Sequence, residues 1–167
     1  MGVILKKIRA GCQQLNVSLS DEQFGKLEAY IHLLVKWNRS YNLTAIRDPE
    51  KMVSYHLLDS IVLQDHFFER QQSVLDVGSG AGLPGIPLSI VFPGKNFTLL
   101  DSNGKKKRFI TQAKLELGLA NCNVVKHRVE KLVVDQPFDV IVSRAFATLA
   151  DFINCTTHLT CNPGMSY

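Results

Sequence analysis

The stretch at residues 74–90 combines residue types and spacing that suit the binding of a nucleotide-like ligand. It reads VLDVGSGAGLPGIPLSI and places four glycines and two prolines between two apolar runs. Residues 80–85 match G-x-G-x-x-G, a pattern typical of dinucleotide sites, and residues 76–82 match D-x-G-x-G-x-G, a pattern typical of S-adenosylmethionine sites. In both patterns a strand-to-helix turn presents backbone N–H groups to the ligand. The glycines alone leave both ligands open.

The prolines and the acid of this stretch favour S-adenosylmethionine. A pyrophosphate needs free N–H groups in the first helical turn, and Pro84 and Pro87 each lack one. Asp76 would repel a pyrophosphate, whereas it suits the ammonium of a methionine moiety. Asp101, some twenty residues after the glycines, can accept hydrogen bonds from two ribose hydroxyls of either cofactor. We therefore predict S-adenosylmethionine, with a dinucleotide-binding oxidoreductase as a less favoured alternative.

From residue 73 onward short apolar runs alternate with helical segments, a pattern that indicates βαβ units on a parallel sheet. We predict strands at 73–77, 96–101, 123–127 and 138–143, and helices at about 85–91, 104–117 and 148–158. These elements form an α/β domain over residues 71–167. The carboxyl ends of its strands would bring Asp101 to the glycine loop. The segment HRVEKL after the third strand would bring Val129 and Glu130 to an adenine.

The first seventy residues repeat their apolar side chains at three- and four-residue spacing, which indicates helices. Ser20 and Gln23 form a capping-box signature for one helix. Asp48 and Pro49 suit the N-cap and first position of the next. We predict an N-terminal helical segment, residues 1–70, packed on the α/β core.

Basic residues are concentrated in one part of a chain whose formal net charge is +4. Between residues 104 and 128 there are seven basic residues against one acidic residue. Four of the basic residues are consecutive: Lys105, Lys106, Lys107 and Arg108. Such a cluster is either a solvated helix face or a surface for a phosphate-rich partner.

The cysteines and the apolar runs indicate no metal site and no membrane segment. The four cysteines are scattered without zinc-binding spacing, so we predict reduced thiols. No apolar run has the length of a signal peptide or of a membrane-spanning helix. We expect a cytoplasmic protein without a membrane partner.

The residues after the fourth strand indicate which acceptors the site suits. The segment FDVIVSRAFATL contains neither a [D/N]-P-P-[Y/F] motif for an exocyclic amine nor a Pro-Cys pair for a pyrimidine ring. Arg144 occupies that position. A purine ring nitrogen has an exposed lone pair and needs no general base, so catalysis would consist of orienting it. A salt bridge from Arg144 to a nearby acid, such as Asp139, is the alternative interpretation of this arginine.

Five segments carry a resemblance to a known family: KWNRSYNLTAIRDPEKM, HLLDSI, LDVGSGAGLPGIPLSI, TLLDSNGKKKRF and FDVIVSRAFATL. With them most of residues 27–149 resembles ribosomal RNA small subunit methyltransferase G, also called the glucose-inhibited division protein B family. The resemblance implies a class I S-adenosylmethionine-dependent methyltransferase fold, Rossmann-like. It also implies methyl transfer to N7 of a guanosine in 16S rRNA by a monomeric cytoplasmic enzyme. The RNA, the 30S subunit or an assembly intermediate would be its partner.

The same resemblance implies roles for individual residues. The cofactor contacts would be Gly78, Leu83, Asp101, Val129, Glu130 and Arg144. Arg144 would lie nearest to the transfer chemistry, and the run Lys105–Arg108 would bind RNA phosphates. Lys36, Arg39 and Arg47 would extend that surface. Trp37 and Tyr41 would either stack on an unpaired base or belong to the core, and His56 is expected to be structural.

One departure from the family concerns the end of the sequence. Family members continue into a fifth strand that ends in Lys-Gly, and PGMSY at residues 163–167 resembles the start of that strand. We therefore expect the C-terminal strands to be missing, which would leave strand four at the edge of the sheet. The cofactor loops are present, so we expect cofactor binding. An RNA-binding module with a vestigial cleft is the second hypothesis.

Overall fold

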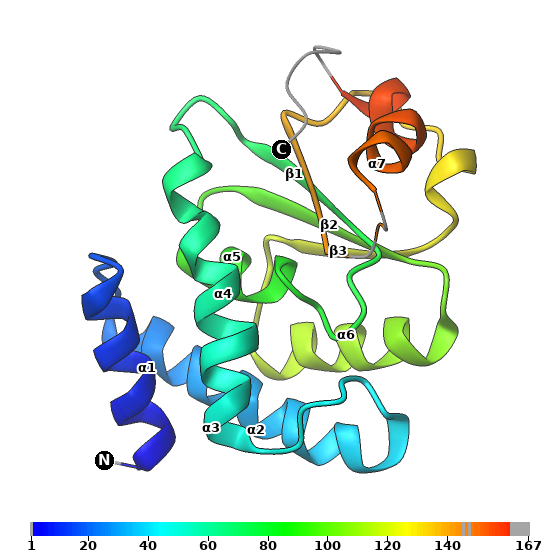
Figure 1. The fold of residues 1–167 in the computed structure, drawn as a ribbon. Helices are drawn as coiled ribbons and strands as arrows, with labels where there is room; N and C mark the ends of the chain where they lie inside the picture. The colour runs from blue at the N-terminus through cyan, green and yellow to red at the C-terminus, as the bar shows by residue number, and fades with distance from the viewer. Residues whose placement is uncertain (1, 145, 147, 161–167) are drawn as a thin grey trace.

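The computed structural model describes residues 2–144, 146 and 148–160. Its first part is helical, as predicted (Figure 1). The helices are α1 (Val3–Gln14), α2 (Asp21–Tyr41), and a helical run made of α3 (Pro49–Met52), the π-helical η1 (Val53–Leu58), α4 (Asp59–Ile61) and the 3-10 helix η2 (Val62–His66). A single helix after Asp48 was expected, and the π-helical turn in the middle of this run is the difference.

The predicted helix starts are confirmed by their hydrogen bonds. The hydroxyl of Ser20 accepts from the N–H of Gln23 at 3.2 Å, and the Gln23 side chain accepts from the N–H of Ser20 at 2.9 Å. Asp48 Oδ1 accepts from the N–H of Glu50 at 2.8 Å, and Pro49 occupies the first helical position. Each cap satisfies N–H groups that the first helical turn cannot pair.

Four parallel strands form one sheet in the order β3-β2-β1-β4. They are β1 (Ser73–Val77), β2 (Asn96–Asp101), β3 (Cys122–Lys126) and β4 (Val140–Ser143). The predicted strands are confirmed, with β3 shifted by one residue and β4 starting at Val140. Val77 pairs with both Leu100 and Ser143, so the carboxyl ends of β1, β2 and β4 meet at one edge of the sheet.

Helices cover both faces of this sheet (Figure 1). The remaining ones are α5 (Gly85–Val91), α6 (Gly104–Glu116), α7 (Leu149–Thr156) and the 3-10 turns η3 (Val129–Lys131) and η4 (Thr157–Leu159). The larger apolar core contains residues of α1, α2, α5, α6 and one sheet face. A smaller core on the other face contains Phe152 of α7. The α/β fold class is confirmed for the described residues.

The N-terminal helices share their core with the sheet. Leu27 and Ile31 of α2 belong to the same apolar cluster as Ile86 of α5 and Leu99 of β2. The helical part ends at His66 and β1 begins seven residues later, at Ser73. Because the core is continuous across this point, the division at residue 70 stays a prediction.

Three further expectations concern single features. The start of a fifth strand at residues 163–167 lies outside the described residues. Within the described part of the chain, no helix has the length and apolar character needed to cross a membrane. Cys12, Cys122 and Cys155 are free thiols there, and Cys161 lies outside it.

Candidate cofactor-binding site

The glycine loop after β1 folds tightly against the end of β2. Gly78, Gly80 and Gly82 have φ values of 70°, 57° and 81°, a backbone region that favours glycine. The N–H groups of Gly78 and Ser79 both donate to the carbonyl of Leu100, at 2.8 and 3.0 Å. The glycine spacing therefore serves a turn that other residues would strain.

Asp101 at the end of β2 is joined to the glycine loop. Its Oδ2 accepts from the N–H of Gly80 at 2.8 Å, and its Oδ1 accepts from the N–H of Asn103 at 2.8 Å. Asn103 in turn caps α6 by accepting from the N–H of Lys105 at 2.9 Å. Each carboxylate oxygen has a second lone pair. Asp101 can therefore also accept from the two hydroxyls of a ribose.

Asp76 lies under the loop rather than beside it. Its side chain is fully buried, and Oδ2 accepts from the N–H of Gly85 at 2.9 Å. Oδ1 has no hydrogen-bond partner among the described residues. Burial raises the pKa of Asp76 to about 8, while the Gly85 N–H opposes that shift. The expectation that Asp76 faces a methionine ammonium finds no support in this position, and the carboxyl organises the loop from below.

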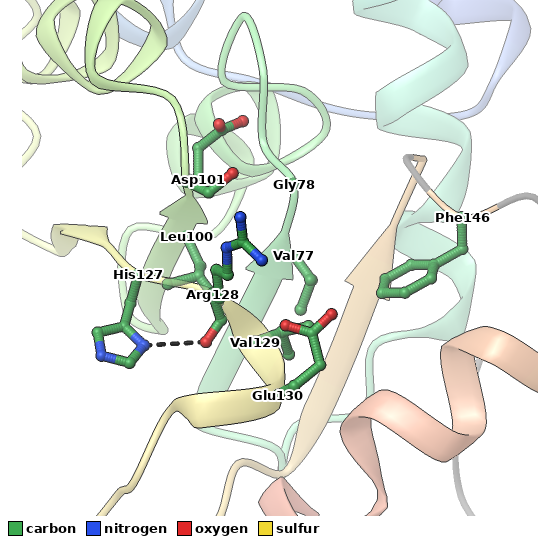
Figure 2. A pocket seen from close by; sticks show the side chains of 10 residues that line it. Val77, Gly78, Leu100, Asp101, His127, Arg128, Val129, Glu130 and Phe146 are labelled. Carbon is green, nitrogen blue, oxygen red and sulfur yellow. Dashed lines mark hydrogen bonds between the residues drawn. The ribbon is translucent and has the colours of Figure 1, made fainter.

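A pocket of about 290 Å³ opens at the carboxyl ends of β1 and β2 (Figure 2). Its lining comes from both strand ends, from the segment after β3 and from the segment after β4. The lining residues are Val77, Gly78, Leu100, Asp101, Ser102, His127, Arg128, Val129, Glu130 and Phe146. This volume is close to the lower end of the range for small-ligand pockets, roughly 300–1,000 Å³.

The pocket has an apolar part and two carboxylates. Val129 is buried, and the Phe146 ring is held by an edge contact with Phe152, 5.4 Å between centroids. Figure 2 shows the side chain of Glu130 between those of Val129 and Phe146, while Asp101 lies on the far side. The apolar side chains can pack against a purine, and Asp101 can accept hydrogen bonds from its ribose. The residues present therefore fit the adenosine half of S-adenosylmethionine.

His127 lines the pocket but is fixed by its neighbour. Its Nδ1 lies 2.9 Å from the carbonyl oxygen of Arg128. A carbonyl only accepts, so Nδ1 carries the proton and donates. The guanidinium of Arg128 extends in Figure 2 toward the side of the pocket where Asp101 lies. The sequence thus supplies a cation to the pocket in addition to the acids.

The structure brings together four of the six residues predicted to contact a cofactor. Gly78, Asp101, Val129 and Glu130 line the one pocket, although they come from three separate segments. Leu83 does not line it. Leu83 is buried, and its side chain belongs to the larger apolar core.

Arg144 does not line this pocket either. Its Nη2 lies 3.4 Å from Asp59 Oδ2 and donates to the carbonyl of Tyr55 at 3.5 Å. The alternative interpretation of Arg144 as a salt-bridge residue is confirmed, but its acid is Asp59 rather than Asp139. Asp139 Oδ2 instead accepts from the N–H of Ser73 at 2.9 Å. Arg144 therefore bridges the end of β4 to the π-helical turn η1.

The π-helical turn beside Arg144 carries His56, whose two ring nitrogens both have partners. Nδ1 lies 3.1 Å from the carbonyl of Tyr55 and Nε2 lies 2.6 Å from the hydroxyl of Thr44. The carbonyl must accept, so the Thr44 hydroxyl donates to Nε2. Burial and the charge of Arg144 lower the pKa of His56. A neutral structural histidine, as expected, satisfies all of these contacts.

Two aromatic residues of α2, Trp37 and Tyr41, pack toward α6. The ring of Trp37 lies 4.8 Å from that of Tyr41 and 5.8 Å from that of Phe109. Trp37 is half-buried in this contact, which matches the core interpretation of this residue. Arg108 donates to the Tyr41 hydroxyl at 3.4 Å and thereby connects the basic run to α2.

The basic run occupies the start of α6, directly after Gly104, the first residue of that helix. Lys105 and Arg108 are exposed, and Lys106 and Lys107 are half-buried. Because α6 begins just after β2 ends at Asp101, the run lies at the same sheet edge as the pocket.

Phe146 is one of the pocket residues that were not predicted from the sequence. It follows the fourth strand within FDVIVSRAFATL, a segment in which only Arg144 was singled out. An aromatic residue soon after a strand end was the available signal. Among the described residues no group of three or more His, Cys, Asp or Glu side chains could hold a metal ion.

Most of the chain matches one protein family and its named members. The model of the GidB family, described as rRNA small subunit methyltransferase G, matches residues 23–167. Ribosomal RNA small subunit methyltransferase G of Ectopseudomonas mendocina (strain ymp) is 56% identical over 154 residues, which are 92% of this chain and 72% of that protein. The protein of the same name from Stutzerimonas stutzeri (strain A1501) is 57% identical over 149 residues, 89% of this chain and 69% of that protein.

Solved structures share the fold at low sequence identity. A precorrin-6y C5,15-methyltransferase from Geobacter metallireducens has a TM-score of 0.54 and 17% identity, over 65% of this chain and 59% of that chain. A methyltransferase from Thiobacillus denitrificans, solved with S-adenosyl-L-homocysteine, has a TM-score of 0.52 and 18% identity, over 81% and 53%. The fold is that of class I S-adenosylmethionine-dependent methyltransferases.

Proposed function

The chain belongs to the rRNA small subunit methyltransferase G (GidB) family, and we propose that it transfers a methyl group from S-adenosyl-L-methionine to N7 of a guanosine in 16S rRNA. The observation that carries this proposal is the pocket in which Gly78, Asp101 and Val129 meet beside the glycine loop. An acid at the end of β2 next to a glycine turn suits an adenosine ribose.

We assign the cofactor contacts as follows. Asp101 accepts from the ribose hydroxyls, and the apolar side chains of Val129 and Phe146 enclose the adenine, with Glu130 at its edge. Gly78 lies at the end of β1, where a missing side chain lets the methionine half approach the backbone. Because the side chain of Leu83 lies in the core, the predicted contact of this residue with the cofactor would be made by its backbone.

The bound cofactor would supply an electrophilic methyl group on a sulfonium. N7 of guanine has an exposed lone pair and no proton, so the chain has only to orient the base and exclude water. Arg144 is proposed as the residue nearest to this step. Its guanidinium is held at the end of β4 by Asp59 and by the carbonyl of Tyr55. Those two contacts fix its direction before substrate arrives.

We propose that 16S rRNA, as part of a 30S subunit or an assembly intermediate, binds along the basic run at the start of α6. Lys105, Lys106, Lys107 and Arg108 would contact phosphates, and the affinity would fall as salt rises. Arg108 contacts Tyr41 at the end of α2, so the basic run lies next to the N-terminal helical segment. Three basic residues of that segment would extend the surface: Lys36, Arg39 and Arg47. The protein would act as a monomer in the cytoplasm.

A methyl-transfer assay with tritiated S-adenosylmethionine, on free 16S rRNA and on 30S particles, tests the proposal. Tritium at guanosine N7 is the expected result. At limiting S-adenosylmethionine, Asp101→Asn should lower incorporation by about 10- to 100-fold while RNA binding is kept. Asp135→Asn makes the same chemical change at an exposed position outside the pocket and should leave incorporation unchanged.

Two other outcomes would overturn the proposal. RNA binding without any incorporation would identify an RNA-binding module with a vestigial cleft. Calorimetric titration that shows binding of NADH and none of S-adenosylmethionine would identify a dinucleotide-binding oxidoreductase.

A further inference from the structure

Tyr30 of α2 connects the N-terminal helices to the glycine loop. Its side chain is fully buried, and its hydroxyl donates to the carbonyl of Ala81 at 2.8 Å. Burial raises the pKa of this phenol far above its ordinary value. The hydroxyl therefore stays protonated and remains a donor throughout the physiological pH range.

The loop's other anchors belong to the α/β part of the chain. The carbonyl of Leu100 accepts from two N–H groups at the start of the loop, and Asp101 accepts from Gly80. Asp76 accepts from Gly85, where α5 begins. Ala81 lies between these anchors. Its carbonyl is the point at which an N-terminal helix reaches the loop.

The backbone around Ala81 needs such an anchor. Gly80 and Gly82 flank it with φ values of 57° and 81°. Glycine has a wide choice of backbone conformations, so this segment has little intrinsic preference for the observed one. A buried carbonyl that loses its donor is unfavourable, and the loop would then populate conformations that expose the carbonyl to water.

Helix α2 also contacts the C-terminal end of α5, the helix that follows the glycine loop. The side chain of Gln23 donates to the carbonyl of Ile90 at 2.8 Å, near the end of α5. Between these two points, Ala81 and Ile86 share the apolar core with Leu27 of α2. One face of α2 thus contacts the glycine loop and both ends of α5.

We infer that Tyr30 is a positioning residue for the cofactor loop, which makes the N-terminal helical segment a part of the cofactor site. The inference rests on the proposed binding of S-adenosylmethionine at this loop. Without the Tyr30 hydroxyl, only a fraction of the molecules has the loop in its binding conformation. The apparent Kd for the cofactor then rises in inverse proportion to that fraction.

Tyr30→Phe removes the hydroxyl and keeps the ring in the core. We expect the calorimetric Kd for S-adenosylmethionine to rise about three- to tenfold, the usual effect of one hydrogen bond. The KM for S-adenosylmethionine should rise by the same factor. Because saturating cofactor restores the loop, kcat should stay within about twofold of the unchanged protein. The KM for RNA should not change.

A matched control is Thr156→Val in α7, on the opposite face of the sheet (Figure 1). Thr156 is fully buried, and its hydroxyl donates to the carbonyl of Phe152 at 2.7 Å. This variant also loses one buried hydroxyl, and it should keep the original Kd and KM. If the role of Tyr30 is merely structural, Tyr30→Phe would have a smaller active fraction and therefore a lower kcat. The KM would then be unchanged in both Tyr30→Phe and Thr156→Val.

Hydrogen exchange gives a readout that does not depend on activity. The N–H groups of Gly82 and Leu83 both donate to the carbonyl of Ser79, at 2.7 and 2.9 Å. They should exchange faster in Tyr30→Phe and at the original rate in Thr156→Val. An unchanged Kd and unchanged exchange in folded Tyr30→Phe would overturn the inference while the proposed function stands. Failure of the unaltered protein to bind S-adenosylmethionine would overturn both.

Discussion

The N–H of Gly80 donates to Asp101 Oδ2 at 2.8 Å, so the glycine loop and the acid at the end of β2 form one unit. The second oxygen of the same carboxylate accepts from Asn103, which caps α6. A single side chain therefore fixes the loop, the helix that carries the basic run, and one wall of the pocket.

Asp101→Asn tests this unit. An amide retains one acceptor oxygen and no charge, so one of the two backbone contacts and the charge-assisted ribose contact are lost. We expect binding of S-adenosylmethionine to weaken by about 10- to 100-fold. Isothermal titration of both Asp101→Asn and the control Asp135→Asn with S-adenosylmethionine measures the effect, and the control should bind normally. Equal affinities of the two variants would exclude Asp101 from the ribose contact.

Asp76→Asn tests the buried carboxyl under the loop. Burial raises the folded-state pKa of Asp76 from its ordinary value near 3.8 to about 8. Between these two values the folded protein binds more protons at this site than the unfolded chain does. The contribution of Asp76 to the free energy of unfolding is therefore complete below about pH 4 and is lost as the pH rises toward 8.

The asparagine variant does not titrate, so its stability relative to the original protein should improve with pH. Urea denaturation at about pH 5.5, 7.0 and 8.5 should show an improvement of about 1 kcal/mol or more across that range. Asp135→Asn is the control, because its free energy of unfolding should differ from that of the original protein by the same amount at each pH. A constant difference for Asp76→Asn as well would mean that Asp76 is ionised throughout this range.

Arg144→Lys tests the guanidinium at the end of β4. Lysine keeps the charge but lacks the planar fork that reaches both Asp59 and the carbonyl of Tyr55. We expect kcat/KM for methyl transfer to fall by about 10- to 100-fold, because misplacement of an orienting group is costly. The activity of Asp59→Asn should fall less, by about threefold to tenfold, since Arg144 itself remains.

The double variant of Arg144 and Asp59 separates a joint role from independent roles. If Asp59 acts through Arg144, the double variant should be no worse than Arg144→Lys alone. Glu22→Gln, which breaks the exposed pair with Lys26 on α2, is a control that should leave the activity intact. Additive losses in the double variant would contradict the joint role.

Lys105→Ala/Arg108→Ala tests the basic run, because both side chains are exposed. We expect affinity for 16S rRNA to fall by about tenfold and the slope of log affinity against log salt to decrease by about 1 to 2. Lys6→Ala/Arg70→Ala removes the same two residue types from α1 and from the segment before β1. Filter binding at several salt concentrations should show no change for this control. An identical salt slope for both pairs would place the RNA elsewhere.

Local patterns in the sequence predicted most of the fold. Short apolar runs between helical periodicities indicated four parallel strands, and the caps at Ser20 and Asp48 marked two helix starts. These features depend on residues close together in the chain. The π-helical turn at Val53–Leu58 was not predicted, because the apolar spacing of the segment suits an ordinary helix equally well. In the structure this turn packs on α1, where Leu58 lies against Gly11.

The sequence by itself determined the glycine turn, the acid at the end of β2 and the order of the pocket segments, because parallel strands place their carboxyl ends at one edge. Only the tertiary structure decided where side chains point. It buried Asp76 under the loop, turned Leu83 into the core, paired Arg144 with Asp59, and brought Phe146 to the pocket. It also joined Tyr30 to Ala81, a contact across 51 residues that no local pattern encodes. Such contacts follow from packing between distant segments, in which burial and hydrogen bonding are satisfied together.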